Sequence, residues 1–286
     1  MPENIPAGTA WMLLAVIWFV VLDAFAKYLI QIYPVAQVVW ARFFFHTLFV
    51  LMMMRTKMPG GIVSEKWNLQ GIRSLTMLIT TTLFFIGLSR VQLATASTIM
   101  FLSPIFITIL AIPMLGELVG LRRWIGVLIG FIGALIIVRP GSISFDIGLF
   151  YLLAAALSHA FYQIATRRVR MYDHALTSLL YTGLVGALIT SFVVPFYWHP
   201  VKPLHWLLFA LLGLAGSVGH LCFIRAFSLA PASTMAPLSY TSLIWATVLG
   251  FIFFGDLPDR WVVLGGSLIV GSGLYIFYRE KQKWRK

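Results

Sequence analysis

Hydrophobic runs long enough to cross a lipid bilayer recur from one end of this 286-residue chain to the other. The hydrocarbon core of a bilayer is about 30 Å thick, so a spanning helix needs roughly 20 apolar residues. We identify ten runs, at residues 9–29, 35–54, 73–90, 94–115, 122–138, 147–166, 175–195, 204–228, 232–254 and 261–278. Because only short segments lie between them, the sequence predicts an all-α membrane protein with ten transmembrane helices and no soluble domain.

The distribution of basic residues predicts how these helices are oriented. The chain has a formal net charge of +12, although only 10% of its residues are charged. If the N-terminus is cytoplasmic, fifteen Lys and Arg residues fall in the even-numbered loops and the C-terminal tail, against five around the odd-numbered loops. Cytoplasmic loops carry an excess of Lys and Arg, so both termini are predicted to be cytoplasmic. The charge therefore indicates orientation and contact with anionic lipid headgroups, and no nucleic-acid partner is expected.

The chain also contains an internal duplication. The stretch "LATASTIMFLS" (93–103) reappears as "LAPASTMAPLS" (229–239) with seven of eleven residues identical, and the same alignment matches Lys27 with Arg167 and Glu117 with Asp256. We expect two five-helix repeats, residues 1–140 and residues 141–286, the second ending in a basic tail. Five is an odd number, so the second repeat enters the membrane from the opposite side. Inverted repeats are the plan of secondary transporters, which bind substrate near the middle of the membrane.

Several ionisable residues lie inside the predicted helices. Asp23 lies about two-thirds along the first run, where a carboxylate costs about 2.5–3.5 kcal/mol at the bilayer centre on insertion scales. Lys27 follows one turn later and is interpreted as an anchor that extends to the outer interface. Arg42 lies at a similar depth in the second run, so we predict a hydrogen-bonded Asp23–Arg42 ion pair. This pair is either a structural clamp or part of a substrate cavity, and the sequence leaves both open.

Histidine and aromatic residues add candidates at the same depth. His46 lies four residues deeper than Arg42, and His159 and His220 fall near the middle of the membrane with Tyr162 and Gln163. Histidine titrates near neutral pH, so it can carry a coupling proton, although a buried histidine is often only a packed core group. Aromatic rings offer stacking faces to a planar or cationic ligand. The candidate substrate-binding or coupling residues are Asp23, Arg42, His46, His159, Tyr162, Gln163, His220, Trp18, Tyr240 and Trp245.

Proline and glycine patterns predict where helices break and where they pack closely. Pro104, Pro113 and Pro237 interrupt the fourth and ninth runs, and each removes a backbone donor. These breaks either frame a polar site and act in gating, or are kinks that serve packing alone. The glycine-rich stretches "GVLIGFIG" (126–133) and "GGSLIVGSG" (265–273) allow close helix contact. That contact lies within one protomer or between two, so the sequence does not decide whether a homodimer forms.

These features together resemble a known family. The paired "LAxAST…LS" stretches, the "GE" and "GD" turns, "VRPG" (138–141) and the ten runs are similar to the EamA branch of the drug/metabolite transporter superfamily. The phrases "DAFAKYL", "QVVWARFF" and "YTSLIWATVLGFIFFGDLPD" resemble the bacterial subgroup that includes S-adenosylmethionine and riboflavin carriers. The resemblance implies an alternating-access carrier in the bacterial inner membrane. It also implies a central cavity lined by both repeats, with the fifth and tenth helices at the periphery.

The expected function is therefore secondary active transport of a small polar or charged metabolite, such as an S-adenosylmethionine-, riboflavin- or amino-acid-like compound. The expected partners are this substrate, the lipid bilayer and a coupling proton or an exchanged substrate. A passive channel and a membrane-embedded enzyme are the alternatives. The motifs HExxH, GxSxG and GxxxxGK[ST] and paired cysteine ligands are absent from the sequence. We therefore predict no catalytic residues, no metal site and no cofactor.

Overall fold

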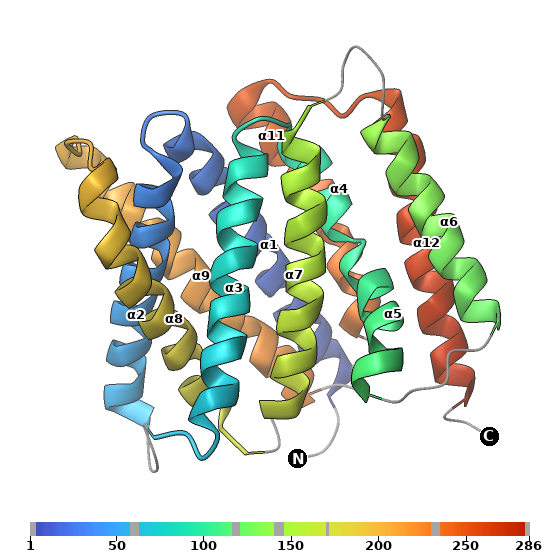
Figure 1. Ribbon diagram of the computed structural model, residues 1–286, viewed down its shortest axis with the longest axis horizontal. Helices are drawn as coiled ribbons and strands as arrows, with labels where there is room; N and C mark the ends of the chain where they lie inside the picture. The colour runs from blue at the N-terminus through green and yellow to red at the C-terminus, as the bar shows by residue number, and fades with distance from the viewer. Residues whose placement is uncertain are drawn as a thin grey trace.

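The computed structural model of this protein is built from helices packed side by side (Figure 1). It describes residues 4–57, 63–115, 121–139, 146–169, 172–229 and 235–283. Within these residues all regular secondary structure is helical. The first half contains α1 (Ile5–Ile30), α2 (Val35–Lys57), α3 (Trp67–Leu88), α4 (Leu93–Met100), α5 (Ser103–Leu115) and α6 (Leu121–Val138). The second half contains α7 (Gly148–Val169), α8 (Ala175–Val193), η1 (Val194–Tyr197), α9 (Pro203–Leu229), η2 (Ala236–Thr241), α11 (Ser242–Phe254) and α12 (Arg260–Lys283).

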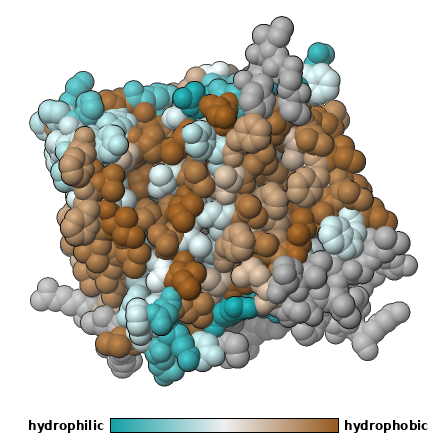
Figure 2. Space-filling model, viewed as in Figure 1, coloured by the Kyte–Doolittle hydropathy of each residue, from teal (hydrophilic) through white to brown (hydrophobic). Residues whose placement is uncertain are grey.

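The surface is that of a protein embedded in a bilayer. Seven helical stretches of the described residues are long and apolar enough to cross a membrane, and the shorter apolar helices Trp124–Val138 and Leu238–Phe254 accompany them. A broad apolar belt separates two hydrophilic rims (Figure 2). Helix α1 begins and helix α12 ends at the same, lower edge of the bundle (Figure 1). The protein is therefore an all-α multi-pass membrane protein. Ten crossings and cytoplasmic termini stay predictions.

Two of the predicted runs are broken helices. The run 94–115 forms α4 and α5, with Phe101 and Leu102 between them, and Pro104 lies in the first turn of α5. The run 232–254 is described from Met235 onward, as the 3₁₀-helix η2 followed by α11. The rings of Phe101 and Tyr240 lie 5.0 Å apart, so the two breaks meet. Pro113 lies in the last turn of α5 and Pro237 in η2, and both of these side chains lie outside the part of the chain that is described.

Glycines bring α6 and α12 together at one side of the bundle (Figure 1). A Cβ atom added to Gly133 would lie 2.7 Å from the Gly265 carbonyl oxygen, and one added to Gly265 would lie 2.4 Å from the Gly133 carbonyl oxygen. Any side chain at either position would push the two backbones apart. The predicted close helix contact is therefore formed within a single protomer.

The helices of the two halves alternate in space, so that the interior is lined by both. Helix α1 packs against α9, α3 packs against α7, and α2 packs against α8 and α9. Gly213 of α9 permits part of this packing, because a Cβ atom there would lie 2.7 Å from the backbone nitrogen of His46. This arrangement brings polar residues of α1, α2 and α3 against those of α7, α8 and α9.

Candidate functional site

One face of α1 carries Asp23 toward the protein interior. Residues four apart lie on the same side of a helix, so Phe19, Asp23 and Lys27 share a face. The Phe19 ring contacts the His220 ring at a centroid distance of 4.9 Å, and the Lys27 ammonium contacts Asp256 on the α11–α12 connection. Asp23 lies between these two inward-facing residues and is only partly buried. Its carboxylate therefore faces protein rather than lipid.

The predicted direct ion pair between Asp23 and Arg42 is not formed. An Nη atom of Arg42 instead donates a hydrogen bond to the Thr81 hydroxyl of α3, and its Cζ atom lies 5.1 Å from the centre of the Phe43 ring. Asp23 and Arg42 are close enough to interact electrostatically. Among the residues that the structure describes, however, no donor lies within hydrogen-bond distance of the Asp23 carboxylate. The two opposite charges face the same interior without touching.

Two of the candidate histidines meet where α2 packs on α9. The ring centroids of His46 and His220 are 6.1 Å apart. The Nδ1 atom of His46 lies 3.0 Å from the Ser217 hydroxyl, whereas its Nε2 atom is buried and has no hydrogen-bond partner. His220 is only partly buried although it faces the interior. An unpartnered, buried nitrogen in a polar interior is a position that a ligand can satisfy.

The third candidate histidine, His159, lies on α7, beside the break between α4 and α5. Its ring stacks on that of Tyr162 with centroids 5.7 Å apart, and its Nδ1 atom lies 3.3 Å from the Ser103 hydroxyl. His159 therefore connects the second half of the chain to the broken helix of the first half.

Sequence reasoning missed a second buried guanidinium group. Arg73 was counted among the loop residues because the third run was predicted to begin there, but α3 begins at Trp67 and Arg73 is only 1% exposed. Its terminal nitrogens donate to the Ser178 carbonyl oxygen at 2.9 Å and to the Thr182 hydroxyl at 2.6 Å. Its Cζ atom lies 5.2 Å from the centre of the Tyr162 ring, and its Nε atom has no partner. The 3.6-residue repeat of an extended helix could have revealed the inward-facing arginine, since Arg73 shares a face with Thr80 and Thr81.

These groups form a polar column across the interior. We define the polar column as the interior residues Asp23, Arg42, His46, Arg73, His159, Tyr162 and His220, several of which are joined by the contacts described above. Thr81, whose hydroxyl accepts a hydrogen bond from Arg42, lies eight residues after Arg73 on α3, which is about 12 Å along the helix axis. The two arginines are therefore bound at different levels of the bundle.

Among the described residues, no hydrogen bond, ion pair or ring contact joins the remaining candidates to the polar column. Gln163 is partly buried but makes no hydrogen bond there, and Trp18 packs against the apolar core. Tyr240 contacts Phe101, and Trp245 on α11 is 37% exposed. Their role as ligand-stacking groups stays a prediction.

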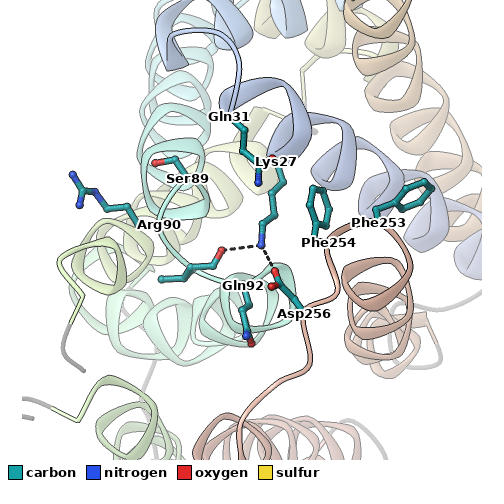
Figure 3. A pocket seen from close by; sticks show the side chains of 9 residues that line it. Lys27, Gln31, Ser89, Arg90, Gln92, Phe253, Phe254 and Asp256 are labelled. Carbon is teal, nitrogen blue, oxygen red and sulfur yellow. Dashed lines mark hydrogen bonds and ion pairs between the residues drawn. The ribbon is translucent and has the colours of Figure 1, made fainter. Parts of the chain in front are cut away.

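A pocket of about 470 Å³ lies where α1 meets the α3–α4 and α11–α12 connections (Figure 3). These connections lie at the edge of the bundle opposite the chain ends (Figure 1). At its base the Lys27 ammonium lies 2.5 Å from an Asp256 carboxylate oxygen and donates a hydrogen bond to the Val91 carbonyl oxygen at 3.2 Å. The Phe254 ring centre is 4.9 Å from the same ammonium. The pocket is lined by Lys27, Gln31, Ser89, Arg90, Val91, Gln92, Phe253, Phe254 and Asp256.

This contact corrects one expectation. Lys27 is 6% exposed and paired, so it does not extend to the interface as an anchor. The N-terminus of α12 is instead capped by Asp259, which accepts a hydrogen bond from the Val262 amide at 2.8 Å. The Lys27–Asp256 pair joins α1 of the first half to the α11–α12 connection of the second half.

Apolar helices packed around buried charged side chains are the arrangement expected of a multi-pass membrane transporter. The profile of the EamA-like transporter family matches this chain twice, over residues 6–139 and 146–278. The chain belongs to the EamA-like transporter family.

Relatives match nearly the whole chain. An S-adenosylmethionine uptake transporter of Rickettsia prowazekii is 28% identical over 96% of this chain and 94% of its own length. A riboflavin transporter of Vibrio cholerae is 28% identical over 98% of this chain and 95% of its own length. A pseudopaline exporter of Pseudomonas aeruginosa is 25% identical over 94% of this chain and 95% of its own length. One solved crystal structure has the same fold, with a TM-score of 0.66, 16% identity and coverage of 95% of this chain and 96% of its own.

Proposed function

We propose that this protein is a secondary active transporter that moves a small polar or charged metabolite across the bacterial inner membrane by alternating access. The observation that carries the proposal is the polar column, in which α1, α2 and α3 of the first half meet α7 and α9 of the second half. Charged groups inside a membrane protein are expensive and mark substrate or ion pathways. A site shared by two halves can face either side of the membrane when the halves rock against each other.

The proposed topology has ten crossings, two inverted repeats (1–140 and 141–286) and both termini in the cytoplasm. The double match of the family profile supports two repeats. The start of α1 and the end of α12 at one edge of the bundle support an even number of crossings (Figure 1). The excess of Lys and Arg in the even-numbered loops supports cytoplasmic termini.

The proposed cargo is a small organic metabolite of the S-adenosylmethionine, riboflavin or amino-acid type. The names of the relatives support this range, and they include both uptake and export. The direction of transport and the coupled proton or exchanged solute therefore need measurement.

We assign the Lys27–Asp256 pair to the closure of the outer end of the pathway. The pair bridges the two halves at the edge opposite the chain ends, and the Val91 carbonyl oxygen on the α3–α4 connection also accepts a hydrogen bond from Lys27. Rocking the halves apart at this edge would break the Lys27–Asp256 contact, whereas Lys27 and Val91 belong to the same half. The arrangement described above is then a state that is closed toward the outside.

Transport in proteoliposomes tests the function. Purified protein is reconstituted, and uptake of radiolabelled S-adenosylmethionine, riboflavin and amino acids is measured with and without unlabelled substrate inside. A carrier gives saturable uptake that is accelerated by internal substrate. Flux without saturation or exchange would indicate a channel, and chemical conversion of the compound would indicate an enzyme.

A further inference from the structure

The polar column contains more positive than negative charge. Arg42 and Arg73 both face it, and Asp23 is its one carboxylate among the described residues. Neither guanidinium has a carboxylate within ion-pair distance in that part of the chain, since their hydrogen bonds go to Thr81, Thr182 and the Ser178 carbonyl oxygen. Hydroxyl and carbonyl oxygens solvate a guanidinium but do not neutralise it.

Several hydrogen-bond donors of the column also lack a partner. The guanidinium group has five N–H donors, and a single hydrogen bond from Arg42, to Thr81, joins it to the described residues. The Nε atom of Arg73 and the Nε2 atom of His46 are buried and unpartnered. Buried donors are normally satisfied, so a ligand with acceptor oxygens fits these positions.

The gap between Asp23 and Arg42 adds a geometric requirement. Both side chains are partly accessible and face the interior, yet no hydrogen bond or ion pair joins them. A group placed between them needs a cationic part for the Asp23 carboxylate and an anionic part for the Arg42 guanidinium. An α-amino acid has both, attached to the same carbon atom.

We propose that the polar column recognises the amino-carboxylate end of an amino-acid-type metabolite, with its ammonium group on Asp23 and its carboxylate on Arg42. Arg73, which lies about 12 Å along the axis of α3 from the residue that binds Arg42, provides a second position for the carboxylate as the substrate moves toward the other side. This inference rests on the proposed transport function and narrows its substrate class. It favours S-adenosylmethionine and free amino acids over riboflavin, which has no carboxylate.

Matched ligand pairs test the inference on the wild-type protein. The probes are S-adenosylmethionine and its decarboxylated form, each free L-amino acid and its amide, and riboflavin. Binding is followed by thermal stabilisation, and transport by counterflow in proteoliposomes. We expect binding of at least one carboxylate-bearing compound, with its carboxylate-free partner weaker by about 10- to 100-fold, as for the loss of a charge-assisted hydrogen bond.

Variants identify the residues responsible. Arg42→Met removes the guanidinium, and it should abolish the preference for the carboxylate-bearing partner. Arg42→Lys should keep part of that preference. Asp23→Asn should weaken binding of compounds with a free ammonium group more than that of their N-acetylated forms. Arg260→Met is the matched control, because Arg260 is exposed at the start of α12 and lies outside the polar column.

The outcomes separate the two proposals. Equal binding of both members of every pair, or binding of riboflavin alone, overturns the amino-carboxylate assignment. If counterflow is still observed in that case, the carrier function stands. Absence of binding by every carboxylate-bearing probe overturns the assignment as well. Flux without counterflow overturns the carrier function itself. If the Arg42→Met variant folds and keeps the full preference for the carboxylate-bearing partner, Arg42 does not belong to the binding site.

Discussion

Replacement of Lys27 by Met should open the pathway toward the outside. Met has a similar length but no charge and no donor, so the variant loses the 2.5 Å contact with Asp256 and the 3.2 Å hydrogen bond to the Val91 carbonyl oxygen. The contact with Asp256 joins the two halves, which move apart when the outer end opens, whereas Val91 belongs to the same half as Lys27. The variant therefore destabilises the outward-closed state more than the outward-open state.

The size of the effect follows from how accessible the pair is. The side chains of Lys27 and Asp256 are 8% and 27% exposed, which places the pair between a surface and a buried ion pair. Surface pairs contribute about 0–1 kcal/mol, whereas breaking a buried pair costs about 3–5 kcal/mol. Water can reach Asp256 once Lys27 is gone, so we expect loss of the pair to destabilise the outward-closed state by about 2 kcal/mol. This corresponds to roughly a 30-fold shift in the equilibrium between the two states.

Cysteine accessibility measures this shift. Cys222 is the single cysteine of the chain, so Cys222→Ala gives a background without thiols. Thr95 is 7% exposed and lies one turn beyond Val91 on the inner side of the pair, so Thr95→Cys reports on opening. A membrane-impermeant maleimide added outside should label this cysteine up to about 30 times faster when Lys27→Met is present.

Two further variants make the test decisive. Exchange of the charges, Lys27→Asp with Asp256→Lys, should return labelling toward the parent rate. Arg139→Met breaks the Arg139–Asp259 pair, whose side chains are 30% and 45% exposed, and should change labelling little. A parent-like rate in Lys27→Met, or a charge-exchanged protein as reactive as the single variant, would refute the closure assigned to this pair.

Further variants test the polar column and the helix packing. Asp23→Asn and Arg42→Ala should each abolish transport while membrane insertion, followed by fluorescence of a C-terminal fusion, stays normal; wild-type flux in either would remove that residue from the site. His159→Ala removes the ring that stacks on its neighbour in α7 and should change substrate affinity or its dependence on pH, and unchanged kinetics between about pH 5 and pH 8 would assign it to packing. Gly265→Val forces backbone atoms apart at the α6–α12 contact and should lower stability by about 1–3 kcal/mol or more, measured as a loss of melting temperature in detergent. Gly271→Ala on the same helix meets no atom within 4 Å and should leave stability equal or slightly higher, so equal melting temperatures for both glycine variants would contradict the packing argument.

Where the helices lie was predictable because hydropathy is a local property. The run predicted at 175–195 is α8, Ala175–Val193, and the run predicted at 35–54 is contained in α2, Val35–Lys57. Proline chemistry is also local, and the break after Met100 falls close to Pro104. The internal duplication was likewise detected by matching one stretch of sequence with another.

The start of α3 was mispredicted for a physical reason. Residues 67–73 include Asn68, Gln70 and Arg73, which look unsuited to a membrane helix. In the structure Gln70 and Arg73 are buried because Ser178, Thr182 and Asp173 receive their hydrogen bonds. A hydropathy pattern contains no information about such partners.

The sequence by itself therefore determined that the chain is a bundle of membrane helices with a few costly charges inside. Tertiary structure alone decided which charges meet. Lys27 pairs with Asp256, 229 residues away, while Arg42 takes Thr81 and leaves Asp23 unpaired. The stability of a charge depends on the dielectric and donors around it, and in a helical bundle these come from segments that are distant in the chain.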